Sequence, residues 1–391
     1  MTAVSDGAAQ RAPICRDAVT WYAYLLLGYF TYLATSQGNI VPFLMEELGL
    51  SYGVVSLHSS MLAVGVLIIG LIGDRIVARF SRRATLAGSA LVSATAVALL
   101  AAAPSVQVTV SASFLIGLTG AFIPAIVPAL LSDIHGSRRD VAITESNALS
   151  YVFAIAAPLI AGYAVWMGWS WRLVPLSAVA AAVVIVATYW RYPVPSGVVQ
   201  SAAADNAPLP AAYWGYWAML GFAVALEFSA LLWAPAYLEK VVGLTPSAAA
   251  VGGGAFFAAM LVGRTAGIRL VGIYSPRAIF LALMVLTFAG FAAYWTAGTP
   301  WLAIVGLFFV GLGISLLFPL TISFALGVAG PASDRAATRV MLAPGLAIVF
   351  NPPLLGSLAD GVGLWLAQLM IPVFASLVLA SYFVAWRLER A

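Results

Sequence analysis

The chain has 391 residues, of which 63% are hydrophobic and only 8% charged, and its formal net charge is +4. Because soluble domains carry about 25% charged residues, this composition excludes a water-soluble globular enzyme and a disordered chain, and it indicates a helical membrane protein. The single cysteine, Cys15, excludes a disulfide framework and a cysteine-based metal site.

Twelve apolar runs follow one another along the chain, and spanning the hydrocarbon layer takes about 20 residues. The runs are residues 18–41, 54–73, 84–103, 107–132, 142–167, 173–190, 212–235, 246–266, 278–297, 300–327, 338–358 and 364–386. The first run lacks a small-residue cleavage site, so we expect a retained helix and not a removed signal peptide. The pattern predicts an all-α membrane protein with twelve transmembrane helices.

Arginine placement predicts the orientation of these helices, because cytoplasmic loops collect Lys and Arg. With the N-terminus inside, sixteen of the eighteen basic residues fall on or near the inner side, and the exceptions are Arg172 and Lys240. We therefore expect a multi-pass protein of the bacterial cytoplasmic (inner) membrane with both termini in the cytoplasm.

The longest polar stretch divides the chain into two halves. Residues 191–211 contain four prolines and read as a cytoplasmic linker between six-helix bundles at 18–190 and 212–386. Cytoplasmic ends are expected at 1–17 and 387–391.

The two halves repeat one plan at an offset of 193 to 194 residues. Matching residues are Gly28 and Gly221, Pro42 and Pro235, Glu46 and Glu239, Gly70 and Gly263, Arg75 and Arg269, Gly117 and Gly311, and Gly162 and Gly356. Because each half has an even number of spans, the repeats are parallel and related by an axis along the membrane normal. We expect two pseudo-symmetric bundles with a site between them.

The loop after the second run carries a motif. The stretch GLIGDRIVARFSRRATL begins at Gly70 and includes Asp74, Arg75, Arg82 and Arg83. It resembles the loop between helices 2 and 3 of the major facilitator superfamily, although the family's next glycine is absent and the basic pair comes later. A degenerate second copy, GRTAGIRLVGIYSPR, follows in the second half. With the twelve spans and the linker, the resemblance covers nearly the whole chain.

The resemblance implies a secondary transporter whose bundles rock to alternate access. In relatives, the Asp of the loop motif braces helix 2 against helix 11 while the inner side is closed. The resemblance carries that role to Asp74, and we expect Arg339 to be its partner. Glu145, which corresponds to Arg339 in the repeat, and Arg264, at the end of the eighth run, complete the predicted cytoplasmic gate. Solvated positive-inside charge is the alternative.

A second family motif is incomplete. Proton-driven exporters of the superfamily often carry Gly-Pro-x-x-Gly-Gly in helix 5, and here residues 157–162 read Ala-Pro-Leu-Ile-Ala-Gly. The partial match favours export over uptake. The alternative is a kink with close helix packing, which small residues permit.

Glu227 is the ionisable residue that lies well inside a run. Its helical neighbours in GFAVALEFSALLWAP are small or apolar, so the sequence offers it no local cation. A charge there costs about 2.5–3.5 kcal/mol on insertion scales, so it requires an explanation. A carboxyl that alternates between buried and exposed states can take up and release a proton, and we predict that Glu227 couples protons or binds substrate. A protonated carboxyl bonded to a neighbouring helix is the alternative.

Polar and aromatic side chains on four runs are predicted to line a substrate cavity. In the first run they recur at spacings of three and four residues, so they share one helix face. The candidates are Tyr24, Gly28, Thr31, Tyr32, Thr35 and Asn39 in the first run, Asn147, Ser150 and Tyr151 in the fifth, Phe228 and Trp233 in the seventh, and Asn351 in the eleventh. Such a lining suits an amphipathic or weakly polar organic molecule. Hydrogen bonding between helices is the alternative.

No ATP-binding loop, nucleophile elbow or metal-ligand spacing occurs in the sequence. We therefore predict a protein that is not an enzyme, uses no metal or cofactor, and draws energy from an ion gradient. The predicted function is proton-coupled export of a small organic solute by antiport. Proton-coupled uptake of a nutrient by symport is the first alternative, and a non-transporting receptor or scaffold is the second. The expected partners are the solute, protons and the lipid bilayer, without nucleic acid, and the protein is expected to be monomeric.

Overall fold

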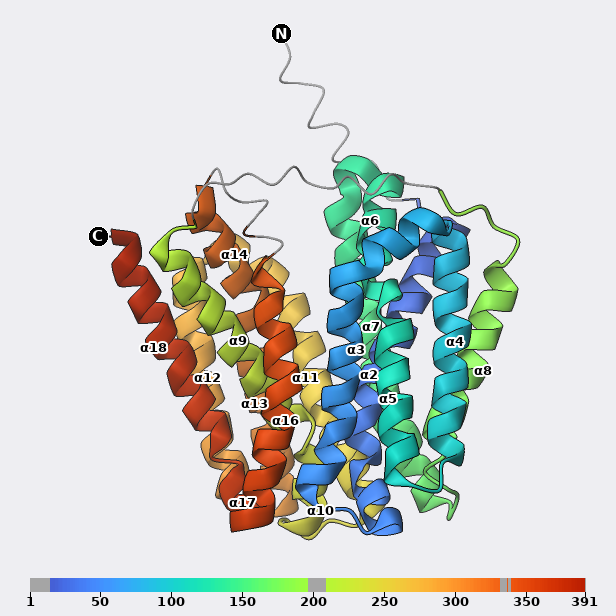
Figure 1. Ribbon diagram of the computed structural model, residues 1–391. Helices are drawn as coiled ribbons and strands as arrows, with labels where there is room; N and C mark the ends of the chain where they lie inside the picture. The colour runs from blue at the N-terminus through green and yellow to red at the C-terminus, as the bar shows by residue number, and fades with distance from the viewer. Residues whose placement is uncertain (1–14, 196–208, 331–335, 337–338, 391) are drawn as a thin grey trace.

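Two helical bundles stand side by side, one from each half of the chain (Figure 1). The computed structural model describes residues 15–195, 209–330, 336 and 339–390, apart from the side chains at positions 74, 78, 137, 140 and 268. The described part is helical and contains no strand. We call the side where the first helix begins and the last helix ends the terminal side, and the opposite one the far side.

Each bundle contains six spans. The first-half helices are α2 (Ala18–Leu48), α3 (Tyr52–Arg79), α4 (Arg82–Ala102), α5 (Val106–Gly120), α6 (Phe122–His135), η1 (Gly136–Arg138), α7 (Arg139–Trp166) and α8 (Leu173–Tyr189). The second-half helices are α9 (Ala211–Leu231), α10 (Ala234–Lys240), α11 (Pro246–Ile273), α12 (Pro276–Trp295), α13 (Pro300–Ile314), α14 (Leu317–Ala329), α16 (Leu342–Val362), α17 (Leu364–Ala367) and α18 (Met370–Arg390). In the described part, ten stretches are long and apolar enough to cross a membrane. The shorter α8 and the tyrosine-rich α2 bring the number to twelve.

Prolines divide four of these spans into two helices each. A proline lacks the amide that would bond to the carbonyl four residues earlier, so a helix often ends there. Breaks stand four or five residues before Pro124, Pro235, Pro319 and Pro372, where α5, α9, α13 and α17 end. The twelve predicted spans are therefore present, and the fourth, seventh, tenth and twelfth are each built from two helices.

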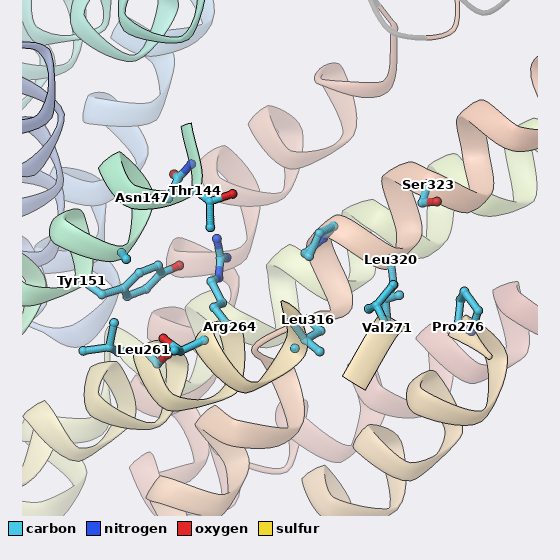
Figure 2. Close-up of a pocket in the computed structure, with 14 residues that line it drawn as sticks. Thr144, Asn147, Tyr151, Leu261, Arg264, Val271, Pro276, Leu316, Leu320 and Ser323 are labelled. Atoms are coloured by element: carbon cyan, nitrogen blue, oxygen red, sulfur yellow. Dashed lines mark hydrogen bonds between the residues drawn. The ribbon is translucent and has the colours of Figure 1, made fainter. Parts of the chain in front are cut away.

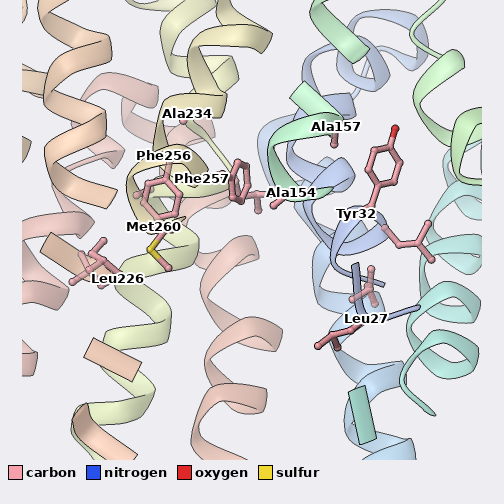
Figure 3. Close-up of a cluster of buried hydrophobic side chains, with 14 of the residues drawn as sticks. Leu27, Tyr32, Ala154, Ala157, Leu226, Ala234, Phe256, Phe257 and Met260 are labelled. Atoms are coloured by element: carbon pink, nitrogen blue, oxygen red, sulfur yellow. The ribbon is translucent and has the colours of Figure 1, made fainter. Parts of the chain in front are cut away.

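Buried apolar side chains fill both bundles and form one continuous cluster that crosses the interface between them. Figure 3 shows buried side chains such as Leu27 of α2 in the first bundle, and Leu226 of α9 and Met260 of α11 in the second. Phe257 of α11 points toward Ala154 of α7 (Figure 3). The bundles meet along two helix pairs, α7 with α11 and α3 with α16.

Glycine allows the closest helix contact within the first bundle. A Cβ at Gly117 of α5 would lie 1.9 Å from the carbonyl oxygen of Leu62 in α3, which the backbones could not accommodate without moving apart. We expect Gly117→Ala to destabilise the protein by about 1–3 kcal/mol, as overpacking does. The midpoint of thermal unfolding in detergent should fall by several degrees.

Gly88 of α4 provides the matched control for this prediction, because a Cβ there meets nothing within 4 Å. Gly88→Ala should leave the midpoint unchanged or raise it slightly, since alanine favours the helix by about 1 kcal/mol. Equal midpoints for the two variants would contradict the packing argument.

A salt bridge joins three segments of the first bundle on its far side. The Arg172 guanidinium, before α8, donates two hydrogen bonds to the Glu47 carboxylate at the end of α2. Its Nε also donates to the Ala101 carbonyl of α4 at 2.8 Å, and the Trp171 indole donates to Glu47 at 3.0 Å. The hydrogen bonds from Arg172, and to a smaller degree the one from Trp171, hold the pKa of Glu47 below its usual value.

This arrangement predicts how stability depends on pH. The folded-state pKa of Glu47 lies below its unfolded value, so its stabilisation is present above the unfolded pKa and is lost as pH falls through the folded one. We expect Glu47→Gln to lower the unfolding midpoint near neutral pH, with the difference from the unmodified protein shrinking below about pH 4, the ordinary glutamate range. Thermal unfolding across a pH series measures this, and a pH-independent difference would contradict it.

Contacts between the bundles close the far side. The backbone amides of Tyr52 and Gly53, at the start of α3, each donate to the Asp360 carboxylate of α16 at 2.8 Å. In the other helix pair, the Ser247 hydroxyl of α11 donates to the Gly162 carbonyl of α7 at 2.7 Å. The two helix pairs occupy equivalent places in the repeat, so the closure follows the pseudo-symmetry of the fold.

Candidate functional site

A cavity of about 450 Å³ lies between the bundles in the terminal half of the molecule (Figure 2). Helix α7 forms its wall on one side, and α11 and α14 form it on the other. It is lined by Thr144, Asn147, Ala148, Tyr151, Leu261, Arg264, Thr265, Gly267, Val271, Pro276, Leu316, Pro319, Leu320 and Ser323. Most of this surface is apolar, with a few polar groups contributed by α7, α11 and α14.

Arg264 is the charged residue of the cavity wall. Its guanidinium lies over the Tyr151 ring, 4.8 Å from the ring centroid, and Figure 2 shows it reaching toward Thr144 and Tyr151. Glycines on either side of Arg264 let α11 pack closely against the junction of α13 and α14. Cβ atoms at Gly263 and Gly267 would collide with side chains there. Among the described residues nothing accepts a hydrogen bond from its buried Nε.

The position of Arg264 differs from the sequence expectation. We expected it at the end of the eighth span, as part of a gate. Helix α11 continues to Ile273, so Arg264 lies more than two turns inside the helix. The length of this helix was underestimated because polar and charged residues follow Arg264 in the sequence. They end the apolar run before the helix itself ends.

Glu227 belongs to the same electrostatic cluster. Its side chain on α9 is partly buried and interacts attractively with Arg264, and Tyr151 interacts with both charges. In the described part of the chain, no hydrogen bond or ion pair joins Glu227 to Arg264 directly. The sequence offered Glu227 no cation because α11 supplies it, 37 residues later.

The polar stripe of α2 does not contribute to the cavity wall. Thr31 and Thr35 donate to the carbonyls of Leu27 and Thr31, four residues earlier on their own helix. The Asn39 amide donates to the Thr35 carbonyl in the same way. Such local bonds satisfy the two hydroxyls without a ligand, whereas the Asn39 Oδ1 is buried and has no partner among the described residues.

The larger residues of that stripe pack inside the first bundle. The Tyr32 hydroxyl donates to the Val174 carbonyl of α8 at 3.1 Å, and the Tyr24 hydroxyl donates to Glu145 at 2.9 Å. A Cβ at Gly28 would lie 2.6 Å from the Phe153 ring. Periodicity identified a shared face, but in this structure that face packs against α7 and α8.

Two of the other predicted cavity residues, Asn147 and Tyr151, do line the cavity. Ser150 is buried and bonds to the Ser146 carbonyl of its own helix. Asn351 of α16 donates to the Ala225 carbonyl of α9 at 2.9 Å, so it joins two helices of the second bundle.

The two predicted aromatic lining residues have different surroundings. Phe228 is partly buried on α9 and does not line this cavity. Trp233 is fully buried and packs edge-on against Tyr52, with ring centroids 5.5 Å apart, near the far-side closure.

The predicted gate residues are dispersed over the terminal side. Glu145 forms a salt bridge with Arg16, with Nη2 of Arg16 2.7 Å from its Oε1. Arg82 is buried and pairs with Asp133 at 2.5 Å, which ties α4 to α6. Arg83 lies over the Trp190 ring.

Those remaining gate residues whose side chains are described form no salt bridge with any other side chain that the structure describes. Gly70 and Arg75 are exposed, and the Arg339 carbonyl accepts a hydrogen bond from the Trp217 indole at 3.0 Å. The Asp74 side chain lies outside the described part of the structure, and with it the proposed contact to Arg339. Among the described residues, no group of three His, Cys, Asp or Glu could hold a metal ion.

Comparison with known proteins identifies the family. The sequence model described as the Major Facilitator Superfamily matches residues 21–270. No curated protein sequence matches the chain. Among solved structures, it is similar to a bacterial homologue of the human lysosomal transporter Spinster, in an inward-facing and occupied conformation, with a TM-score of 0.77 at 16% identity over 96% of this chain and 98% of that one.

Two further structures share the fold at low sequence identity. The unoccupied inward-facing form of the same Spinster homologue gives a TM-score of 0.79 at 14% identity, over 96% of this chain and 98% of that one. A D-xylose–proton symporter gives 0.78 at 13% identity, over 94% and 97%. Because the family match covers well over half of the 391 residues and the folds agree along nearly the whole chain, this chain belongs to the major facilitator superfamily.

Proposed function

We propose that the protein carries a small organic solute across the cytoplasmic membrane by alternating access, coupled to protons through Glu227. The observation that carries this proposal is a cavity between two bundles that are joined on the far side. A membrane receptor or scaffold needs neither the cavity nor an ionisable cluster of Glu227, Arg264 and Tyr151 within its spans.

The arginine distribution supports a cytoplasmic terminal side, with both chain ends and the 191–211 linker inside. In that orientation the bundles are closed toward the outside and the cavity belongs to an inward-facing state. The similarity to structures described as inward-facing supports the same interpretation. We propose a monomer in which each bundle, 18–190 and 212–386, moves as one body.

Export by exchange with protons is the first candidate direction, from the partial exporter motif at 157–162. In the structure, Pro158 and Gly162 of that segment pack against α11, which supports the packing interpretation of the motif as well. Uptake together with protons is the second candidate. It is favoured by the attraction between Glu227 and Arg264, because a carboxyl that loses its charge on protonation leaves Arg264 available to a solute.

The test is proton flux in proteoliposomes that contain a trapped pH dye. Pools of metabolites and antibiotics would be added outside, and a solute-dependent pH change in the lumen is the expected result. Acidification of the lumen when solute enters indicates symport, and alkalinisation indicates antiport. Absence of a pH change together with preserved tracer exchange would reject proton coupling, and absence of exchange for every pool would reject transport.

A further inference from the structure

We infer that the solute bound in the cavity is an organic anion, whose carboxylate binds the guanidinium of Arg264. This inference rests on the proposed function, because it assigns a substrate class to the same cavity. It starts from the charge of the wall. Of the residues that line the cavity, Arg264 is charged and none is Asp or Glu.

Part of the hydrogen-bonding capacity of Arg264 is unfilled. A guanidinium carries five N–H donors, and its Nε is buried without an acceptor among the described residues. The guanidinium carbon lies 4.8 Å from the centroid of the Tyr151 ring, and this cation–π contact does not replace a hydrogen-bond acceptor for Nε. A carboxylate is the planar acceptor that matches such an edge with two parallel bonds.

The rest of the cavity fits an apolar body attached to that carboxylate. Leu261, Val271, Leu316 and Leu320 supply apolar walls, and Asn147 supplies an amide within the same wall. Ligand cavities usually measure about 300–1,000 Å³, and this one measures about 450 Å³. One arginine suits a monocarboxylate better than a phosphate or a dicarboxylate, each of which would leave a second charge unpaired.

Glu227 links binding of the anion to binding of a proton. Ionised Glu227 attracts Arg264 and competes with an anionic solute, whereas protonated Glu227 does not. Among the described side chains, the titratable groups that interact with Arg264 are Tyr151 from α7 and Glu227 from α9. Because linkage is reciprocal, anion binding must favour protonation of Glu227 to the same degree. Proton and anion would therefore move together as a neutral pair, which selects the second candidate of the proposed function, transport together with protons, over exchange with protons.

The experiment compares acids with their uncharged amides. Purified full-length protein in detergent would be titrated with benzoate and benzamide, with 3-phenylpropionate and 3-phenylpropionamide, and with hexanoate and hexanamide. Binding is read from the shift in thermal unfolding midpoint and by calorimetry. At least one acid should bind at least tenfold more tightly than its amide, and more tightly as pH falls.

Variants locate the effect. Arg264→Gln should weaken binding of the acid by tenfold or more. Arg264→Lys keeps the charge but not the two parallel N–H donors, so its affinity for the acid should lie between those of Arg264→Gln and the unmodified protein. Arg269→Gln, an exposed arginine on the same helix, should bind the acid as the unmodified protein does. Glu227→Gln should retain acid binding and lose its dependence on pH. The unliganded midpoint of each variant shows whether it is folded.

The inference is overturned if amides bind as tightly as acids, if Arg264→Gln binds the acid unchanged, or if no acid of the series binds. Transport is tested separately, by adding the tightest acid to proteoliposomes and to protein-free liposomes; flux here means the excess over the protein-free liposomes, because the neutral forms of these acids cross a bilayer unaided and carry a proton. Acid binding without flux would reject the proposed function and keep the anion site. Solute-dependent proton flux with amides and not with acids would reject the anion site and keep the proposed function.

Discussion

Replacing Glu227 with glutamine should abolish proton-driven transport while leaving the carrier able to exchange solute across the membrane. Glutamine has nearly the same size and keeps a hydrogen-bonding side chain, but it cannot take up or release a proton at physiological pH. Solute-dependent proton flux should fall by at least tenfold. Exchange of labelled for unlabelled solute, which needs no net proton movement, should remain within about threefold of the unmodified protein.

The physical reason is the electrostatic attraction between Glu227 and Arg264. An ionised carboxylate near a cation in a membrane interior is partly compensated, whereas an unpaired one costs several kcal/mol, about 2.5–3.5 on insertion scales. Protonation of Glu227 therefore depends on whether Arg264 is engaged elsewhere, and this dependence is what couples two binding events. Removing the titratable group removes the coupling but not the solute contacts.

The matched control is Glu239→Gln. Glu239 lies on α10, the continuation of the same span, but pairs with its neighbour Lys240 on the far side, away from the cavity. Its replacement should leave proton flux within about twofold. If Glu227→Gln keeps full driven transport, Glu227 is structural and the coupling group lies elsewhere.

The plan of the fold could be predicted from the sequence because its signals are local. A run of about 20 apolar residues is recognised without knowing its neighbours. The same holds for the repeat, which placed Gly162 and Gly356 at equivalent positions, and for the loop motif at Gly70. The breaks within spans could not be predicted from proline alone: a proline follows each break by four or five residues, but α2, α7 and α16 continue through prolines of their own.

The site was less predictable, because its residues come from three helices far apart in the chain. Glu227 was recognised as costly from its own run, but its cation, Arg264, is contributed by α11 and was assigned to the gate. The polar stripe on α2 was recognised by the spacing of its residues. Spacing shows that they share one helix face, but it does not show which neighbouring helix or cavity that face contacts. Thr31 and Thr35 satisfy their hydroxyls on their own helix, an outcome that no spacing rule distinguishes from cavity lining.

Replacing Gly356 with valine should block transport by preventing closure of the far side. A Cβ at Gly356 of α16 would lie 2.5 Å from the carbonyl oxygen of Tyr52 and 3.1 Å from the Cα of Gly53, both in α3. Both neighbours are backbone atoms, so no side-chain rotation can relieve the contact. The valine branch would add to this overlap, and the two helices would have to separate.

Separation would also break the Asp360 contacts, because the amides it binds belong to Tyr52 and Gly53. Hydrogen bonds to a charged group contribute about 1.5–3 kcal/mol each, so losing one shifts the balance between the two states by roughly tenfold or more. Solute exchange should fall by more than tenfold. The overlap arises where the two bundles meet and not inside either of them, so the unfolding midpoint should change little.

The conformational change can be measured directly. Cys15→Ser removes the native thiol, and Ser247→Cys places one at the other far-side helix contact. A membrane-impermeant maleimide added from outside should then react at least several-fold faster when Gly356→Val is added to this double variant than with the double variant alone. Unchanged labelling together with unchanged exchange would show that the far side closes without this helix contact.

Gly361→Val separates steric blocking from a general effect of valine in α16. Gly361 lies on the same helix, and a Cβ there meets nothing within 4 Å, so exchange and labelling should match the background.

The repeat extends the argument to the other helix pair. A Cβ at Gly162 would lie 2.4 Å from the Val251 side chain and 2.9 Å from the Ser247 carbonyl oxygen. Gly162→Val should therefore impair closure as Gly356→Val does, although less severely, because the Val251 side chain can partly move aside and the nearest backbone atom, the Ser247 carbonyl oxygen, is 2.9 Å away whereas the Tyr52 carbonyl oxygen is 2.5 Å from a Cβ at Gly356.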